Sequence, residues 1–212
     1  GIPQEVGTFS NDSRVASALG IEPLKQEESA SASVGFTANL SEANIKIAVD
    51  GYFIAIEDRV TLTDTFTATT DELRDELSEA GATAAALFAN AIDTESRGLD
   101  VVLTHKGTIN NTRIKTDLSG SFSQTRQVDD IHASEITVRG GQLNRYFSES
   151  SRIFLEDATV NQKVNLSNTI SFDKWNLFLR NVYFGEVTST TGQEFASKIV
   201  TDLSASYDYN DS

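Results

Sequence analysis

The chain contains 212 residues, carries a net charge of −14 at pH 7 and has no cysteine. Disulfides and thiolate metal sites are therefore excluded, and nucleic acid is not an expected partner, because binding it requires clustered lysine and arginine. No stretch approaches the ~18–20 consecutive apolar residues of a transmembrane helix, and the chain opens at Gly1 without the pattern of a signal peptide.

The first 27 residues are expected to lead into a sheet. They contain both prolines of the chain, Pro3 and Pro23, and a helical turn is predicted over Ser13 to Leu19, ended by Gly20. Everything after Pro23 is free to pair in a sheet, because each later residue retains its backbone N–H group.

The dominant feature after this segment is an alternation of apolar and polar side chains with a period of two. In one run, Ile114 and Leu118 alternate with Lys115 and Asp117. Successive side chains of a strand point to opposite faces, so such a run predicts a strand with one apolar and one polar face. About seven strands are predicted, near residues 28–38, 44–60, 90–105, 113–125, 157–170, 176–188 and 197–208.

The predicted connections alternate in length. Short polar turns are expected at Asn39–Ala43, Lys106–Thr112 and Ser171–Lys174, and long loops at about Thr61–Phe88 and Arg126–Asp157. Short turns on one side and long loops on the other are typical of a bacterial outer-membrane barrel, whose long loops face the exterior.

The first long loop contains a segment with helical spacing. Thr70 is placed to cap a helix that runs to Ala80, with Leu73 and Leu77 on one face and Gly81 after its end. The sequence therefore predicts one short helix inside an extracellular loop.

Four stretches of the chain resemble sequences of TonB-dependent outer-membrane receptors. They are Pro23-Leu24-Lys25-Gln26-Glu27-Glu28-Ser29 with the following Val34-Gly35-Phe36, the run VDGYFIAIEDRV from Val49 to Val60, the run FANAIDTESRGLD from Phe88 to Asp100, and the run NVYFGEV from Asn181 to Val187. The third stretch is the most specific. The order and spacing of the four also match the family, and the resemblance covers nearly the whole chain.

The resemblance implies an all-β fold, an antiparallel up-and-down meander of about seven strands that is a segment of a 22-stranded transmembrane β-barrel. Residues 1–212 would form a partial receptor barrel domain, with an extracellular loop and strand lead-in at 1–27 and barrel strands and loops at 28–210. The family's plug domain, TonB box and final strands have no counterpart in this sequence, and a periplasmic turn is expected at 210–212. The chain is thus expected to be a fragment of a bacterial outer-membrane protein.

In such a barrel, one face of each strand meets lipid and the other lines the lumen. The residues expected on the lipid side are Ala32, Val34, Phe36, Ile114, Leu118, Leu203 and Ala205. Those expected toward the lumen are Ser31, Ser33, Lys115, Asp117, Asp202 and Ser204. Aromatic residues such as Trp175 and Tyr207 are expected at the membrane interfaces.

The resemblance also implies a function. The intact protein would bind a scarce nutrient outside the cell, such as a ferric siderophore or a similar metal complex, and would import it with energy from the TonB complex, which the missing N-terminal region would engage. Its partners would be this small molecule, the TonB complex and outer-membrane lipid. A passive porin or adhesive barrel and a soluble all-β ligand-binding module remain as alternatives, and neither enzymatic activity nor a cofactor is expected.

Candidate ligand-binding residues lie in the second long loop. It carries Arg139, Arg145, Tyr146 and Arg152 in an otherwise acidic protein. Arginine and tyrosine suit a ligand with carboxylate or phosphate groups. The alternative is that these arginines only pair with acidic neighbours in the loop.

A metal site is the other chemistry considered for this loop. Asp129, Asp130, His132 and Glu135 lie close enough in sequence to suggest one. A solvated acidic loop is the preferred interpretation, so no metal ligand and no catalytic residue is assigned.

Overall fold

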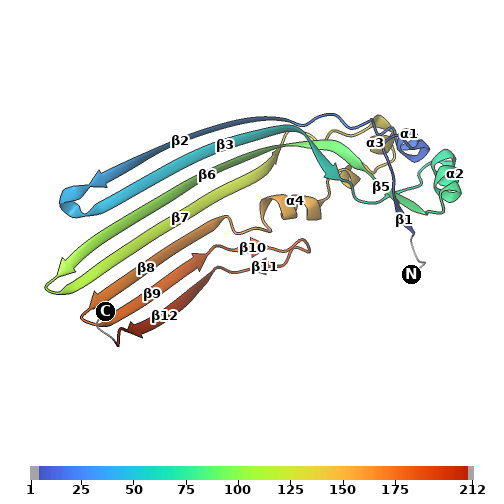
Figure 1. Cartoon of the computed structure of the whole chain (residues 1–212). Coiled ribbons are helices and arrows are strands. Elements are labelled where there is room, and N and C mark those ends of the chain that lie inside the picture. Colours follow the sequence, from blue (N-terminus) through green and yellow to red (C-terminus); the bar gives the residue numbers. More distant parts are fainter. Residues whose placement is uncertain (1–4, 210–212) are drawn as a thin grey trace. The chain divides into compact units, whose positions relative to one another are not determined.

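A computed structural model of the chain describes residues 5–209 and contains a seven-stranded sheet. The strands of this sheet are β2 (Glu28–Leu40), β3 (Ile45–Leu62), β6 (Phe88–Ile109), β7 (Thr112–Val128), β8 (Gln162–Phe172), β9 (Trp175–Phe184) and β12 (Lys198–Tyr207). Their order across the sheet is β12-β9-β8-β7-β6-β3-β2, so that strands follow one another in the order of the chain (Figure 1). This order confirms the predicted up-and-down meander.

Short turns follow β2, β6 and β8, as predicted. Each contains an Asn or Asp residue with a positive φ angle, namely Asn44 (51°), Asn110 (51°) and Asp173 (48°). These residue types tolerate the left-handed backbone that tight hairpin turns require. The first turn also contains the 3-10 helix η1 (Ser41–Ala43). Since β6 continues to Ile109, the turn before β7 is shorter than predicted.

The chain divides into two compact units, of which one is built from long strands. It comprises Ser31–Phe53, Ser96–Gln124 and Asp157–Ser212. Within it, β7, β8, β9 and β12 pair antiparallel with an unbroken register. Because a one-residue slip would move every side chain to the opposite face, an unbroken register keeps each face uniform across the four strands.

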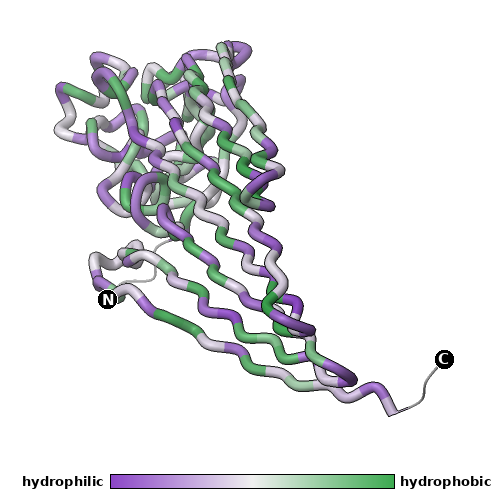
Figure 2. Tube along the Cα trace, turned by 90° about the vertical axis from the view of Figure 1, so that its left-hand side faces the viewer, coloured by the Kyte–Doolittle hydropathy of each residue, from purple (hydrophilic) through white to green (hydrophobic). Residues whose placement is uncertain are grey.

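One face of these four strands is mostly apolar and the other mostly polar, and the alternation along each strand is visible in Figure 2. Register and alternation place Ile114, Leu118, Leu166, Ile170, Leu177, Leu179, Leu203 and Ala205 on the apolar face. They place Lys115, Asp117, Ser119, Ser167, Arg180, Asp202 and Ser204 on the polar face. Arg180 and Asp202 form an ion pair of 2.6 Å there. This division agrees with the predicted grouping of side chains into two faces.

The other unit comprises Gly1–Ala30, Ile54–Glu95 and Thr125–Glu156. Its described part contains short helices and a second sheet, in the order β1-β5-β4. The bounds of its short elements are β1 (Val6–Thr8), α1 (Arg14–Leu19), β4 (Phe66–Thr67), α2 (Asp71–Glu79), β5 (Ala84–Ala86), α3 (Glu135–Arg139), η2 (Leu143–Arg145) and α4 (Glu149–Glu156). Its hydrophobic core includes Leu19, Phe66, Leu73, Leu77, Leu87 and Ile92, all of them buried.

Both predicted helices are present with their predicted ends. The hydroxyl groups of Ser13 and Thr70 each accept a hydrogen bond from the backbone N–H group three residues later, which satisfies a donor of the first turn. Gly20 and Gly81, with φ angles of 68° and 70°, follow α1 and α2 in the left-handed conformation.

The two long connections contain more structure than predicted. The first holds β4 and β5 in addition to α2, and the second holds α3, η2 and α4. These elements are too short to show a clear period in the sequence. The strand β1 also pairs in parallel with β5, a contact between distant segments that no local pattern signals.

Several predicted boundaries also differ. The strand expected at 157–170 begins only at Gln162, since α4 extends to Glu156. The strand expected at 176–188 ends at Phe184, and the two residues of β10 (Val187–Thr188) pair instead with β11 (Glu194–Phe195). The turn expected at 210–212 lies outside the described residues. Within residues 5–209, no helix has the length and apolar character needed to cross a membrane.

Candidate functional site

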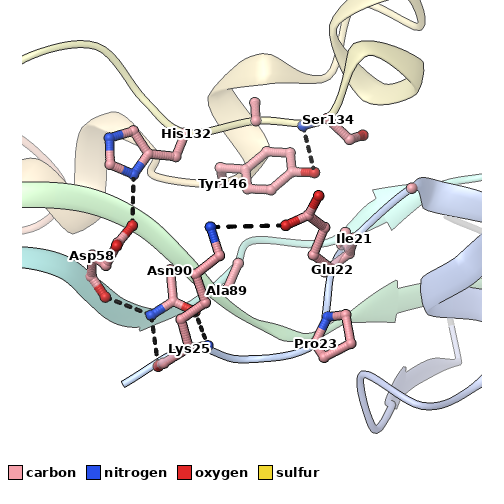
Figure 3. A pocket seen from close by; sticks show the side chains of 12 residues that line it. Ile21, Glu22, Pro23, Lys25, Asp58, Ala89, Asn90, His132, Ser134 and Tyr146 are labelled. Atoms are coloured by element: carbon pink, nitrogen blue, oxygen red, sulfur yellow. Dashed lines mark hydrogen bonds and ion pairs between the residues drawn. The ribbon is translucent and has the colours of Figure 1, made fainter. Parts of the chain in front are cut away.

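Asn90 is the centre of a hydrogen-bonded node in the unit of short elements (Figure 3). Its side-chain oxygen accepts a hydrogen bond from Lys25 N at 2.8 Å. Its amide nitrogen donates to Lys25 O at 3.1 Å and to Asp58 O at 2.5 Å. One side chain of β6 therefore holds the backbone of the lead-in segment and the backbone of β3.

Two further side chains form hydrogen bonds that connect the lead-in segment, residues 5–27 of the described chain, to β3 and β6. Asn11 Nδ2 donates to Glu22 O at 2.8 Å and to Phe88 O at 2.9 Å. A carboxylate oxygen of Glu27 accepts a hydrogen bond from Val60 N at 2.7 Å. With the bonds of Asn90, these contacts satisfy backbone groups of the lead-in segment, of β3 and of the first residue of β6.

The node gives a physical role to three of the four stretches that carry the family resemblance. Lys25 belongs to the first, Asp58 to the second and Asn90 to the third, and the three residues meet at one point. In the unit of long strands, glycines of the same stretches make room for large neighbours. A Cβ atom on Gly98 would collide with the Tyr52 ring, and one on Gly35 would collide with the Asp50 carboxylate.

His132 lies between two carboxylates next to this node. Its Nδ1 atom is 3.5 Å from Asp58 Oδ1, and its Nε2 atom is 3.4 Å from Asp93 Oδ2. Its backbone N–H group donates to Ala91 O at 2.8 Å. Asp58 has a φ angle of 53°, and its backbone N–H group donates to Asp93 Oδ1 at 2.8 Å. Each nitrogen of the imidazole ring therefore faces one carboxylate group.

His132, Asp58 and Asn90 border a pocket of about 320 Å³. Its lining also includes Lys25 and Glu22, whose charged groups are 3.9 Å apart, and the hydroxyl oxygen of Tyr146, which accepts a hydrogen bond from Ser134 N at 3.1 Å. The pocket thus combines an ammonium group, carboxylates, an imidazole and a phenol. Such a mixture suits a small polar ligand that carries both donors and acceptors.

The structure does not bring the four predicted ligand-binding residues together into one site. Arg139 pairs with Glu135 of its own helix at 2.8 Å. Tyr146 is a core residue, 3% exposed, whose ring meets that of Phe66 edge to face at 5.3 Å. The side chain of Arg145 is exposed, and its carbonyl oxygen accepts a hydrogen bond from Asp64 N.

Arg152, the fourth predicted residue, forms a small ion-pair network along α4. Its guanidinium is 2.5 Å from a carboxylate oxygen of Glu149 and 3.4 Å from one of Glu156. The hydrogen bond from Arg152 lowers the pKa of the Glu149 carboxyl, and the same bond raises the pKa of Arg152. The pairing of Arg139 and Arg152 within their helices is the alternative considered from the sequence, and ligand binding by these residues stays a prediction.

The cluster considered for a metal is not assembled either. The His132 ring contacts Asp58 and Asp93 in place of its sequence neighbours Asp129, Asp130 and Glu135. No group of three or more His, Asp or Glu residues within the described part of the chain could hold a metal ion. Sequence reasoning missed the His132 partners because they come from β3 and β6, although the second and third family stretches contain both of them.

The amphipathic meander, with short turns and long connections, defines the chain as part of an outer-membrane β-barrel. It belongs to the TonB-dependent receptors: residues 4–212 match the family described as "TonB dependent receptor-like, beta-barrel". Members of this family lie in the bacterial outer membrane.

Solved structures of outer-membrane transporters share the fold. The transporter YddB from Escherichia coli has a TM-score of 0.59 and 10% identity, over 97% of this chain and 28% of its own. The FrpB iron transporter from Neisseria meningitidis has a TM-score of 0.57 and 13% identity, over 89% and 25%. The copper transporter OprC has a TM-score of 0.54 and 13% identity, over 88% and 24%. The chain thus spans about a quarter of each of these proteins, and comparison with curated protein sequences finds no match.

Proposed function

We propose that this chain forms part of the wall and loops of a receptor that imports a scarce nutrient as a metal complex, such as a ferric siderophore. The observation that carries the proposal is the family match over residues 4–212. An iron transporter and a copper transporter among the structures of the same fold support a metal complex as the ligand class. Energy for import would come from the TonB complex.

The ligand-facing surface would be formed by the long connections of the barrel. Long connections of outer-membrane barrels face the exterior, where the ligand arrives. In this chain the long connections follow β3 and β7, and the second of them carries Arg139, Arg145 and Arg152. We therefore propose these arginines as contacts for anionic groups of the ligand, since each guanidinium can make paired hydrogen bonds to a carboxylate.

Uptake by the full-length receptor tests this function. The receptor would be expressed in a bacterial strain without its own siderophore receptors, and uptake of radioactive iron would be measured with a panel of ferric siderophores. Transport of at least one complex, and its loss when TonB is deleted, is the expected result. A passive porin would be unaffected by the TonB deletion, and an adhesive barrel would transport none of the complexes.

A further inference from the structure

The apolar face of β7, β8, β9 and β12 is interrupted by four neutral polar side chains, which we call the polar island: Thr116, Asn168, Asn181 and Thr201. Thr116 pairs in register with Asn168, and Asn181 pairs with Thr201. The two pairs occupy adjacent rows, because Asn168 lies opposite Leu179 and Asn181 lies opposite Leu166. The four residues therefore form one diagonal patch across four neighbouring strands.

The polar island lies in the middle of the apolar band. Toward the β8–β9 turn, the face continues through Ile170 and Leu177 to Trp175, whose ring lies against that of Tyr207 in a tilted arrangement, with the centroids 5.0 Å apart. In the opposite direction it continues to Tyr183. Aromatic residues mark the two membrane interfaces of outer-membrane barrels. A patch between two aromatic ends faces the hydrocarbon, where no water can satisfy polar groups.

The hydrogen bonds inside the polar island leave donors unused. Thr116 Oγ1 donates to Asn168 Oδ1 at 2.8 Å, and Thr201 Oγ1 donates to Asn181 Oδ1 at 2.7 Å. Each threonine thereby uses its single hydroxyl proton. For the amide nitrogens of Asn168 and Asn181, the described part of the chain provides no hydrogen-bond acceptor, and an amide group without a partner in hydrocarbon is costly.

We propose that the polar island is a contact site for a second copy of the receptor within the outer membrane. The patch carries amide donors beside carbonyl and hydroxyl oxygens that each keep a lone pair, so it is complementary to itself. A two-fold axis through the patch would direct the Asn168 and Asn181 amides of one copy to oxygens of the other. In such an isologous contact each hydrogen bond forms twice, once from each copy, without a different partner. Hydrogen bonds between polar side chains stabilise the association of transmembrane helices, and the same chemistry is available to polar side chains on a barrel surface.

Cysteine cross-linking in intact outer membranes tests the contact. The full-length receptor, free of other cysteines, would carry Leu166→Cys or Leu179→Cys beside the polar island, and would be treated with a short bis-maleimide. Val34→Cys is the matched control, since Val34 is an apolar residue of β2 that is 79% exposed and outside the four strands. We expect dimers at Leu166 or Leu179 to exceed those at Val34 by about tenfold, the change that one hydrogen bond in a bilayer can produce.

A second pair of variants shows whether the amides are responsible. In N168L/N181L, the cross-link at Leu179→Cys should fall to the level of Val34→Cys, while the receptor keeps the heat-dependent gel mobility of a folded barrel. Asn165→Leu is the control, because Asn165 lies on the opposite face of β8 and should leave the cross-link unchanged.

Three outcomes would overturn the proposal. They are equal cross-linking at the three cysteine positions, a product whose mass shows a different protein, and a dimer that persists in an assembled N168L/N181L receptor. If the double variant fails to assemble, the proposal is judged by comparing the cross-linking yields at Leu166→Cys and Leu179→Cys with the yield at Val34→Cys.

Discussion

Asn90 shows how a single side chain can organise a region that lacks long elements. Its amide makes three hydrogen bonds to the backbones of Lys25 and Asp58. Lys25 lies before the first strand of the sheet, and Asp58 has a left-handed backbone within β3. A backbone group without a partner is costly once it is shielded from water. Aspartate at this position would lose both donors, and leucine would lose all three bonds.

Removing this amide should loosen the lead-in segment. We expect Asn90→Ala to lower the free energy of local opening around residues 22–27 by about 1–3 kcal/mol, because three hydrogen bonds are lost. Hydrogen exchange of the full-length receptor measures this opening. Asn39→Ala is the control, since Asn39 is exposed and its side chain has no hydrogen bond within residues 5–209. Equal exchange in the two variants would remove Asn90 from the role described.

The ion pairs of α4 should make the stability of this helix depend on pH. The folded-state pKa of Glu149 is lowered by the hydrogen bond from Arg152, so the pair stabilises α4 fully above the unfolded pKa of glutamate. This stabilisation is lost as pH falls through the lower folded-state pKa. Hydrogen exchange of α4 should therefore accelerate in acid relative to the unfolded-chain rate, and Glu149→Gln should flatten this dependence. A slope that is unchanged in Glu149→Gln would assign the effect to another carboxyl.

The long strands were predictable because their pattern is local and repeated. Alternation over ten or more residues gives both the strand and its two faces, and the meander follows when short turns join neighbours. The three hairpins depend on Asn44, Asn110 and Asp173, which are residue types with a known preference for left-handed turns. A short turn limits the register of β8 with β9, whereas the registers of β7 with β8 and of β9 with β12, which longer connections join, were not predicted.

A substitution on each face of β7 tests the assignment of those faces. Leu118 pairs with Leu166 on the apolar face, and Ser119 pairs with Asn165 on the polar face. Leu118→Arg should lower the folding free energy in a bilayer by about 2–4 kcal/mol, because the guanidinium would lie near the membrane midplane. Ser119→Arg should cost much less, because it would face the lumen. Folding of the full-length receptor into lipid vesicles measures both, and equal costs would contradict the facing.

Most of the short helices and strands could not be predicted from the sequence. The helix at α2 was found because Thr70, Leu73 and Leu77 combine a cap with helical spacing. The three pairs between β1 and β5 join Val6–Thr8 to Ala84–Ala86. No local sequence pattern indicates this pairing, because the two segments are close only in space. The candidate site likewise contains some residues that can be chosen by local sequence and others that are brought together only by the fold. The candidate arginines were chosen by residue type, whereas the contacts of His132 with Asp58 and Asp93 depend on three separate segments.

The proposed contacts of three arginines with the ligand should contribute to the affinity of the whole receptor. Replacing Arg139, Arg145 and Arg152 together with glutamine should raise the Kd for an anionic metal complex by about tenfold or more, since each charged hydrogen bond contributes about 1.5–3 kcal/mol. The barrel should remain assembled, because Arg139 and Arg145 are exposed and the side chain of Arg152 pairs with Glu149 and Glu156 of its own helix. Direct binding to the purified receptor measures the change.

The control for this triple variant is Arg74→Gln, an arginine of the first long connection that pairs with Asp71 of its own helix. It should bind the metal complex as the native receptor does. An unchanged Kd in the triple variant would place ligand recognition outside these arginines.

The strand β2, at one margin of the seven-stranded sheet, has a further consequence. Sheets that end in water usually carry lysine, proline or a bulge on the outermost strand, which discourages other chains from adding to it. The thirteen residues of β2, ESASASVGFTANL, contain neither lysine nor proline. No strand among residues 5–209 pairs with its outer row of N–H and C=O groups, so this row can accept a further strand. Wherever no neighbouring strand covers β2, we expect it to pair with an extended peptide or with β2 of a second copy.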